Sequence, residues 1–348
     1  MIDKVIIHIG IEKTATTSLQ TFLRENKENL LKQGFFLPSA AGKLNQSLFA
    51  LSFYRGNANF LKRHGLIGAG EQTKMRIDLN RNLRAELEAL TPTPQAMIIT
   101  SEWLHSKLTT SDEVEALVDF LKGFAKTVEV ICYLKEQSAL LNSRYSTHLK
   151  SGLTESFSVF VQNCSPYDSY YNHQKTVSRW AAATNESEFK CRIFAEKALI
   201  GRSIHRDFLA QIGADFEKSH WRKTPSLNQS LSFKGAMILR ALNETLDFPL
   251  IKQKYKDAIF NALTGSYNFI TETQYNRIDS EFSPSNEAVR KRFFPHKTKL
   301  FSKREVFNEN GSLEDKLYPN VLLATQDILS QSGNQINDTV IRQIINLN

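Results

Sequence analysis

Apolar and polar residues alternate in blocks along the first two thirds of the chain. Short continuous apolar runs are typical of strands buried on both faces, whereas apolar residues three and four apart are typical of amphipathic helices. The continuous runs predict strands at Val5–Ile9, Ala96–Thr100, Val128–Leu134 and Phe189–Phe194. The spaced patterns predict helices at Thr16–Glu25, Leu83–Leu90, Asp112–Phe124 and Ser138–Lys150. Buried strands separated by helices indicate the α/β class, as a three-layer fold with a central parallel sheet flanked by helices.

The remaining segments predict an insertion and a helical C-terminal appendage. Residues 40–80 are polar and irregular, which indicates an insertion with short helices. Further helices are predicted at Ser230–Leu242, Ser285–Phe294 and Leu317–Leu329. We therefore expect one α/β domain over residues 1–310, with an insertion at 40–90 and a helical part at 225–310, followed by a polar, partly helical tail at 311–348.

Composition and charge narrow the class of protein. Of the 348 residues 41% are hydrophobic and 23% are charged, which is typical of globular proteins. The three cysteines form no CxxC pair and the histidines form no HExxH motif, so we expect no metal site. The net charge is +8, and residues 287–304 hold seven Lys or Arg against one Glu. This basic run is either a solvated face or an anion-attracting surface, and because no nucleic-acid motif accompanies it we expect no nucleic-acid partner.

The distribution of apolar residues also bears on location. No apolar run approaches the roughly 18 residues that a membrane-spanning helix needs, so we expect no integral membrane segment. The N-terminus opens at once on a strand-like segment, Lys4–Ile9, rather than on a signal peptide. Together with the few cysteines, these features predict a cytoplasmic protein.

The junction between the first strand and the first helix carries the clearest chemical signal. Its sequence, HIGIEKTATTS (8–18), places Gly10 at the end of the strand and Lys13 before a run rich in hydroxyl residues. Glycine permits a tight turn, and the amides of Thr14–Ser18 at the positive end of a helix attract anions. This predicts a P-loop-like site for a phosphorylated nucleotide, with a plain strand-to-helix turn as the alternative. It is not a Walker loop, because Glu12 replaces the glycine that precedes the lysine in that motif.

A second candidate site follows the third predicted strand. Lys135 lies at the carboxyl end of that strand, and Ser143 lies eight residues later on the next helix. Ligands of open α/β sheets bind at the carboxyl ends of strands, so Lys135 should face the same crevice as the loop at Gly10–Ser18. Taken alone, each is an ordinary strand-end lysine or helix serine.

The two segments together resemble the sulfotransferases that use 3′-phosphoadenosine 5′-phosphosulfate (PAPS), and most of all the bacterial branch. In that family a K-[ST]-G-T-[TS] core binds the 5′-phosphosulfate, and a basic residue at a later strand end, with a serine eight residues on, binds the 3′-phosphate. This chain has KTATT at 13–17, inside HIGIEKTATTSLQ, and Lys135 with Ser143 at the family spacing. Further similar stretches are YSTHLKSG (145–152), RDFLAQIG (206–213), NQSLSFKGAMILRALN (228–243) and SNEAVRKRFF (285–294). Ala15 stands where the family has glycine, and Lys135 where it usually has arginine.

The resemblance implies the cofactor and the residues that hold it. The cofactor is PAPS, with 3′,5′-adenosine bisphosphate (PAP) as its product, and the chemistry requires no metal. Arg290 and Arg292, on a basic helix, would form an additional clamp. The other cofactor-binding residues that the resemblance implies are Gly10, Lys13, Thr14, Ala15, Thr16, Thr17, Ser18, Lys135 and Ser143.

The implied reaction is in-line sulfuryl transfer to an acceptor hydroxyl with the help of a general base. Glu102 is the candidate base, because it follows the second strand at the strand-end crevice, where the family often places a catalytic His or Glu. His105, three residues on, is the reserve candidate. Lys13 would neutralise the charge that develops on the leaving phosphate oxygen. The resemblance suggests a saccharide or glycan as the acceptor.

Two other functions stay open at this stage. A P-loop kinase acting on a small molecule would bind ATP with magnesium, against which stands the missing second glycine of the loop. A non-catalytic nucleotide-binding or glycan-binding protein on the same fold would be consistent with Ala15 and Lys135, which depart from the family pattern.

Overall fold

A computed structural model gives the conformation of most of the chain. It describes residues 1–218, 220–222, 231–246, 253–265, 267–303, 307, 313–333 and 336–347. The contacts divide these residues into two units. The first unit comprises 1–135, 167–227 and 285–301, and the second comprises 136–166, 228–284 and 302–348. The predicted division between residues 310 and 311 stays a prediction.

The first unit is built on a sheet of five parallel strands, which confirms the predicted fold class. The strands are β1 (Ile2–His8), β2 (Phe35–Phe36), β3 (Ala96–Thr100), β4 (Ala125–Leu134) and β5 (Phe189–Ile193). Their order in the sheet is β2-β3-β1-β4-β5. In the centre, Ile6 of β1 pairs with Ile98 of β3 on one side and with Glu129 of β4 on the other. The chain order reverses direction at β1, which puts the end of β1 at the switch point where open α/β sheets bind ligands.

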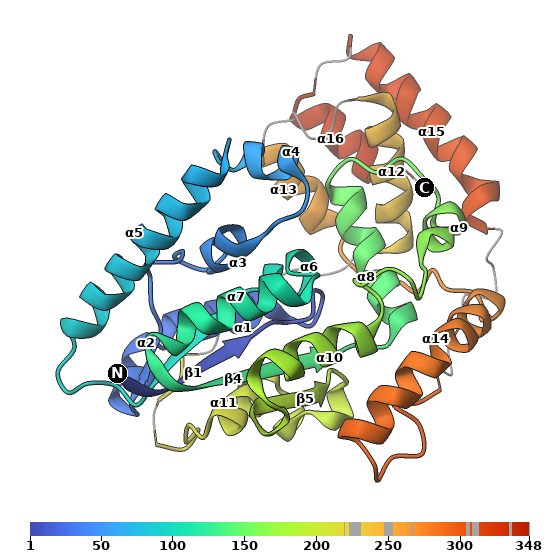
Figure 1. Cartoon of the computed structure of the whole chain (residues 1–348). Helices are drawn as coiled ribbons and strands as arrows, with labels where there is room; N and C mark the ends of the chain where they lie inside the picture. Colours follow the sequence, from blue (N-terminus) through green and yellow to red (C-terminus); the bar gives the residue numbers. More distant parts are fainter. Residues whose placement is uncertain are drawn as a thin grey trace. The chain divides into compact units, whose positions relative to one another are not determined.

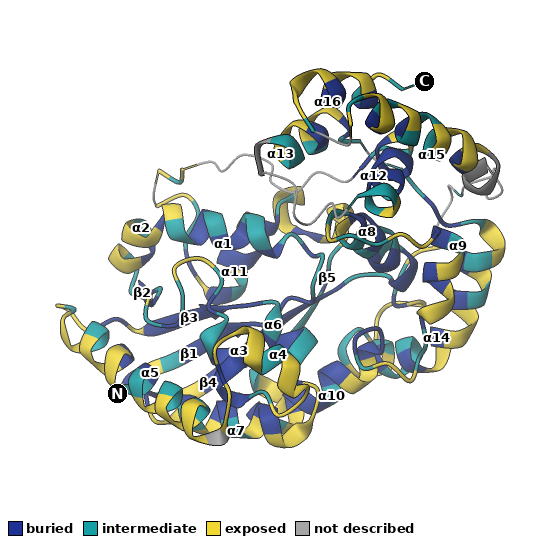
Figure 2. Cartoon of the chain, turned by 90° about the horizontal axis from the view of Figure 1, so that it is seen from above, coloured by how far each residue is buried: buried dark blue, intermediate teal, exposed yellow. Residues whose placement is uncertain are grey.

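Helices of the first unit cover the sheet or extend from its edge. They are α1 (Thr16–Glu25), α2 (Lys27–Lys32), α3 (Leu48–Phe53), α4 (Ala58–Arg63), α5 (Ala69–Glu88), α6 (Trp103–Lys107), α7 (Ser111–Lys122), α10 (His173–Thr184) and α11 (Ile204–Ile212). Short 3₁₀ helices lie at Glu186–Glu188, Glu196–Ala198 and Ile200–Arg202. Helices α1 and α11 lie on one face of the sheet and α7 and α10 on the other (Figure 2).

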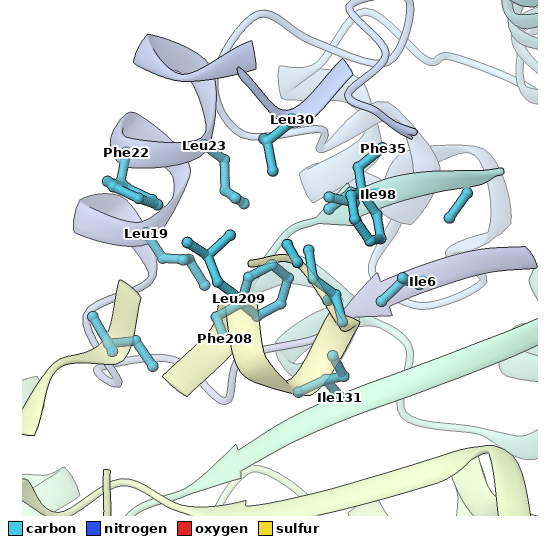
Figure 3. Packing of buried hydrophobic residues seen from close by; sticks show 14 of the residues in the cluster. Ile6, Leu19, Phe22, Leu23, Leu30, Phe35, Ile98, Ile131, Phe208 and Leu209 are labelled. Carbon is cyan, nitrogen blue, oxygen red and sulfur yellow. The ribbon is translucent and has the colours of Figure 1, made fainter. Parts of the chain in front are cut away.

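The apolar stripe of α1 shows why this layered arrangement forms. Phe22 and Leu23 follow Leu19 by three and four residues, so the three side chains lie on one face of the helix, and all three are buried. They pack with Phe208 of α11 against Ile6 of β1 (Figure 3). Burying a side chain of this size contributes about 1.5–3 kcal/mol, so this face of the sheet anchors α1 and the loop that precedes it.

The second unit is helical. Its helices are α8 (Gln137–Lys150), α9 (Phe157–Phe160), α12 (Phe233–Thr245), α13 (Gln253–Ala262), α15 (Leu313–Gln331) and α16 (Asp338–Ile345), with a 3₁₀ turn at Val161–Asn163. Helix α12 packs on α15, and α16 contacts α13 and α15 (Figure 1). Met237 and Ala241 of α12 form a small apolar cluster with Tyr318 of α15. The predicted helix at 317–329 is thus confirmed within α15, while Ser230, the predicted start of another helix, lies outside the described residues.

Two predicted helix boundaries are wrong. Helix α5 starts at Ala69, inside the segment that was expected to be irregular. Leu79 and Leu83 are buried along one side of it, and the Glu71 carboxylate accepts a hydrogen bond of 3.0 Å from the Gly68 N–H at its start. Helix α14 runs over Glu272–Phe293 rather than starting at residue 285. A stripe of buried residues, including Ile278 and Phe282, continues through Pro284 and maintains the helix across it. Every described helix is too short or too polar to cross a membrane.

Candidate active site

The loop after β1 stays paired with β4 before it turns into α1. Ile9 donates its N–H to the carbonyl oxygen of Ile131 at 3.2 Å, and Ile11 donates to Tyr133 at 3.0 Å. Tyr133 returns a bond of 2.6 Å from its N–H to the Gly10 carbonyl. The loop therefore leaves the sheet at its carboxyl edge in a fixed position.

Gly10 is required by the backbone geometry at this point. Its φ is +93°, and a Cβ atom built there would lie 3.1 Å from the amide nitrogen of Glu12 and 3.6 Å from Cα of Glu102. Only glycine adopts such a conformation at low cost. The same close approach brings the main chain of Glu102, just past β3, against the loop.

Two residues of the turn have a left-handed backbone. Lys13 has φ 66° and Ala15 has φ 58°. Turns of this kind can direct successive N–H groups toward one side, as in the concave nests that bind anions. The Thr14 hydroxyl, fully buried, donates to the Ile11 carbonyl oxygen at 2.6 Å. That hydroxyl, which was expected to face the ligand, thus stabilises the turn.

Helix α1 begins without a capping side chain. Ala15 is its N-cap residue and supplies no hydrogen-bond acceptor beyond its carbonyl, to which Leu19 donates at 3.0 Å. The first turn contains no acidic residue. The amides of residues 16–18 therefore keep the positive end of the helix dipole available to an anion.

The hydroxyl groups at the start of α1 lie in different surroundings. Thr16 is buried, with 6% of its surface exposed, while Thr17 is half-buried. The Ser18 hydroxyl lies 3.1 Å from Nε2 of His205 on α11. Burial lowers the pKa of His205, and a hydrogen bond with the Ser18 backbone opposes that shift.

Lys13 interacts electrostatically with two carboxylates. Burial lowers the pKa of its ammonium group, and the negative charges of Glu12 and Glu102 oppose part of that shift. The Lys13 carbonyl oxygen accepts a hydrogen bond of 3.1 Å from Nζ of Lys135, at the end of β4. The loop and the ends of β3 and β4 are thereby brought together at one edge of the sheet.

The Glu102 carboxylate is held by two side-chain amides. Gln20 of α1 donates to its Oε2 at 2.8 Å, and Asn45 donates to its Oε1 at 3.0 Å. Asn45 is oriented in turn by Ser101, whose hydroxyl donates to Asn45 Oδ1 at 2.6 Å. Each carboxylate oxygen retains a second lone pair, so Glu102 can still accept a proton.

The surroundings of Glu102 make its carboxylate more basic. Burial is the main cause that raises its pKa, and the charge of Glu12 adds to it. Hydrogen bonds, including that from Gln20, and the charge of Lys13 oppose the rise. A raised carboxyl pKa beside a lysine is characteristic of functional sites.

The reserve candidate His105 is 1% exposed on α6. Its ring centroid lies 5.2 Å from that of Tyr170, whose hydroxyl donates to Glu12 at 2.8 Å. Gln20 and Asn45 were not among the predicted site residues. Only Gln20 left a signal in the sequence, as a polar residue next to the apolar stripe of α1.

Lys135 and Ser143 belong to different units. Lys135 is the last residue of the first segment of the first unit. Its carbonyl oxygen lies 2.8 Å from Nε2 of His173, and its Nζ donates to the Lys13 carbonyl oxygen. Ser143 lies on α8 in the second unit, and its hydroxyl donates to the Ala139 carbonyl at 3.0 Å. Their joint role at a 3′-phosphate stays a prediction.

The two arginines of the predicted clamp make local ion pairs. Arg290 forms two hydrogen bonds, of 2.6 and 2.9 Å, with Glu287, and also donates to the Lys297 carbonyl. Arg292 bonds to Glu186 at 2.7 Å. Both arginines thus fasten the end of α14 within the first unit, and their clamp role stays a prediction. Arg304, at the end of the basic run, lies outside the described residues.

The chain is similar to two known proteins, but these similarities do not assign it to a family. No protein-family model matches the sequence. A protein from Archaeoglobus fulgidus described as uncharacterized is 26% identical over 182 residues, which are 51% of this chain and 49% of that protein. The chain thus spans about half the length of the curated relative it matches. The crystal structure of a sulfotransferase from Alicyclobacillus acidocaldarius is similar with a TM-score of 0.46 and 11% identity, covering 83% of this chain and 94% of that one.

Proposed function

We propose that this chain is a PAPS-dependent sulfotransferase that transfers the sulfuryl group to a hydroxyl of a saccharide or glycan. One observation carries the proposal: Lys13, on a nest-like loop that enters an uncapped helix, lies within electrostatic range of Glu102. An anion-binding loop, a cation and a basic carboxylate are the three groups that in-line sulfuryl transfer needs. The motifs that resemble those of the sulfotransferases support PAPS as the nucleotide.

The residues at the loop fit the anionic half of this cofactor. The amides of residues 14–18 would hold the 5′-phosphosulfate, because no capping side chain and no acidic residue compete at the start of α1. Lys135, with Ser143, would hold the 3′-phosphate, and Arg290 and Arg292 would add to that clamp. PAPS supplies an activated sulfuryl group when it is bound.

The reaction follows from the positions of Lys13 and Glu102. Glu102 takes the proton from the acceptor hydroxyl while the hydroxyl oxygen forms its bond to sulfur. Lys13 would neutralise the charge left on the bridging phosphate oxygen of PAPS as that oxygen leaves sulfur. Gln20 and Asn45 hold the base in place throughout. His105 packs beside this group and remains the reserve base.

Aromatic side chains beside Glu102 support a saccharide as the acceptor. Trp103 follows the base directly, and its ring lies 5.5 Å from that of Phe60 and 5.1 Å from that of His64. Both Trp103 and Phe60 are half-buried, so part of each ring reaches the surface. Binding sites for small molecules combine aromatic faces with a few polar groups in this way.

Titration calorimetry with PAP and with ATP plus magnesium tests the proposal. We expect PAP to bind without a metal, and the Lys13→Ala variant to bind it at least tenfold more weakly. Lys32→Ala, at an exposed lysine near the end of α2, is the matched control and should bind PAP normally. Binding of magnesium-ATP alone would overturn the proposal in favour of a kinase. Binding of PAP without any sulfuryl transfer to a panel of saccharides would instead indicate a nucleotide-binding protein.

A further inference from the structure

Glu12 places a negative charge where the chain should bind a polyanion. It directly precedes Lys13 in the loop and is only half-buried. Nothing in the fold of the loop requires a carboxylate at this position, since neighbouring backbone contacts determine its course. The role of Glu12 therefore has to come from what its side chain contacts.

The Glu12 side chain is held by Tyr170. The Tyr170 hydroxyl donates to Glu12 Oε2 at 2.8 Å. The tyrosine is itself fixed, because its N–H donates to Asp168 Oδ1 at 2.8 Å and its ring packs against those of His105 and Tyr171 at 5.2 and 5.0 Å. With only 9% of its surface exposed, Tyr170 is a rigid donor that fixes the carboxylate.

The fixed carboxylate acts on two charged neighbours. Its charge raises the pKa of Lys13, against the effect of burial, and it also raises the pKa of Glu102. Both effects depend on distance and on exclusion of water, so a carboxylate free to move into solvent would exert them less. Other titratable groups beside this cluster include His105 of α6, Lys135 just past β4, Asp168 and Tyr170 itself.

We propose that Tyr170 is a positioning residue that fixes the Glu12 carboxylate beside Lys13 and Glu102. There the negative charge supports Lys13 as an ammonium ion and Glu102 as a base. The benefit to catalysis rests on the proposed function, whereas the coupling between Tyr170, Glu12 and Lys13 does not. The cost is a weaker attraction of the loop for anionic nucleotides.

The coupling is measurable in the full chain without any ligand. Acetic anhydride reacts only with the neutral amine, so the extent of Lys13 acetylation against pH, read by mass spectrometry, reports the titration of Lys13. We expect Glu12→Gln to move the midpoint to lower pH by at least half a unit. Tyr170→Phe should move it in the same direction, and should have no further effect when it is added to Glu12→Gln. Tyr167→Phe, at a tyrosine that is 86% exposed, should leave the midpoint unchanged.

A second variant tests the position of the charge rather than its presence. Glu12→Asp retains the carboxylate but shortens the side chain by one methylene, which breaks the hydrogen bond to Tyr170 even where Tyr170→Phe folds poorly. We expect a midpoint between those of the wild type and Glu12→Gln. Unchanged midpoints in Glu12→Asp and Tyr170→Phe would overturn the proposal, as would midpoints that move to higher pH. An effect of Tyr170→Phe that is equally large in the wild type and in Glu12→Gln would also overturn it. Because no nucleotide is present, these outcomes are independent of whether the chain transfers sulfuryl groups.

Discussion

Nζ of Lys135 donates a hydrogen bond of 3.1 Å to the main-chain carbonyl oxygen of Lys13. This bond ties the end of β4 to the left-handed turn of the loop. A lysine suits the task because its ammonium group is a compact donor, whereas the planar guanidinium of arginine is suited to a bidentate anion. Lys135, which stands where the sulfotransferases that the sequence resembles usually have arginine, thus has a structural role.

Lys135→Met should therefore destabilise the unliganded chain. A charged donor to a carbonyl contributes about 1.5–3 kcal/mol when buried, and this half-buried bond should contribute about 1 kcal/mol. Urea unfolding without nucleotide measures the loss, and Lys32→Met, at an exposed lysine of α2, is the control. If stability were unchanged and only PAP binding fell, Lys135 would act on the ligand alone.

Ala15→Gly should stabilise the protein. Ala15 has φ 58° and ψ 29°, a conformation that costs a residue with a Cβ roughly 1–2 kcal/mol and costs glycine almost nothing. Glycine is also a better N-cap than alanine, although its greater freedom in the unfolded chain offsets part of the gain. We expect a net gain of about 0.5–1 kcal/mol in the free energy of unfolding. Ala89→Gly, at the exposed C-cap of α5, controls for the unfolded-state effect. Equal changes in both variants would contradict strain at Ala15.

The sequence was most informative where local pattern and tertiary packing agree. Helix Thr16–Glu25 and strand Ala96–Thr100 match their predictions at both ends, because an apolar stripe or run is bounded by loop residues. The two-residue strand Phe35–Phe36 was missed, since so short a run gives no periodic signal. Helix α5 was misplaced because its exposed faces are so polar that only Leu79 and Leu83 mark the buried side.

The candidate site was predictable only in part for a related reason. Lys13 and Glu102 could be found because each lies in the segment that follows a strand, and parallel strands end at one edge of the sheet. Asn45 and Tyr170 reach that edge from segments with no regular pattern, and the contacts they make span 57 and 158 residues. Pairings of this kind depend on tertiary structure. The predicted cytoplasmic location stays a prediction.

His8 should make the protein sensitive to acid. Its side chain is fully buried on β1, bonded to the Thr100 hydroxyl at 2.9 Å, and burial lowers its pKa from 6.5 to about 3. The unfolded chain therefore takes up a proton below pH 6.5 that the folded chain refuses, and stability falls as the pH drops from 6.5 toward 3. His173, lowered to about 4, acts in the same direction.

His8→Asn should reduce the slope of the unfolding free energy against pH between 6.5 and 4. The reduction should be up to about 1.4 kcal/mol per pH unit, which corresponds to one proton. Chemical unfolding at closely spaced pH values measures that slope. His296→Gln, at an exposed histidine, is the control. An unchanged slope in His8→Asn would mean that the folded protein accommodates the proton at His8.

Glu102→Gln should separate catalysis from binding. Loss of a general base lowers the rate about 10²–10⁴-fold, so kcat for sulfuryl transfer should fall by that factor while the affinity for PAP stays within a few-fold. Full turnover by the variant would mean that Glu102 is not the base and would leave His105 as the candidate.

Glu102 should also affect how stability depends on pH, which can be measured without substrate. Its folded pKa is raised above 4.5, so the folded chain holds a proton that the unfolded chain has released, and stability decreases as the pH rises from 4.5 through the folded pKa.

Glu102→Gln cannot titrate, so its stability should lack this decrease, whereas Glu88→Gln, at an exposed residue of α5, should retain it. Unfolding free energies between pH 4 and 8 test the difference. A decrease that persists in Glu102→Gln would mean that another carboxyl carries the raised pKa, and the base would then have to be sought there. Burial of Glu102 thus lowers the stability of the wild type at neutral pH. The same burial makes the carboxylate a stronger base.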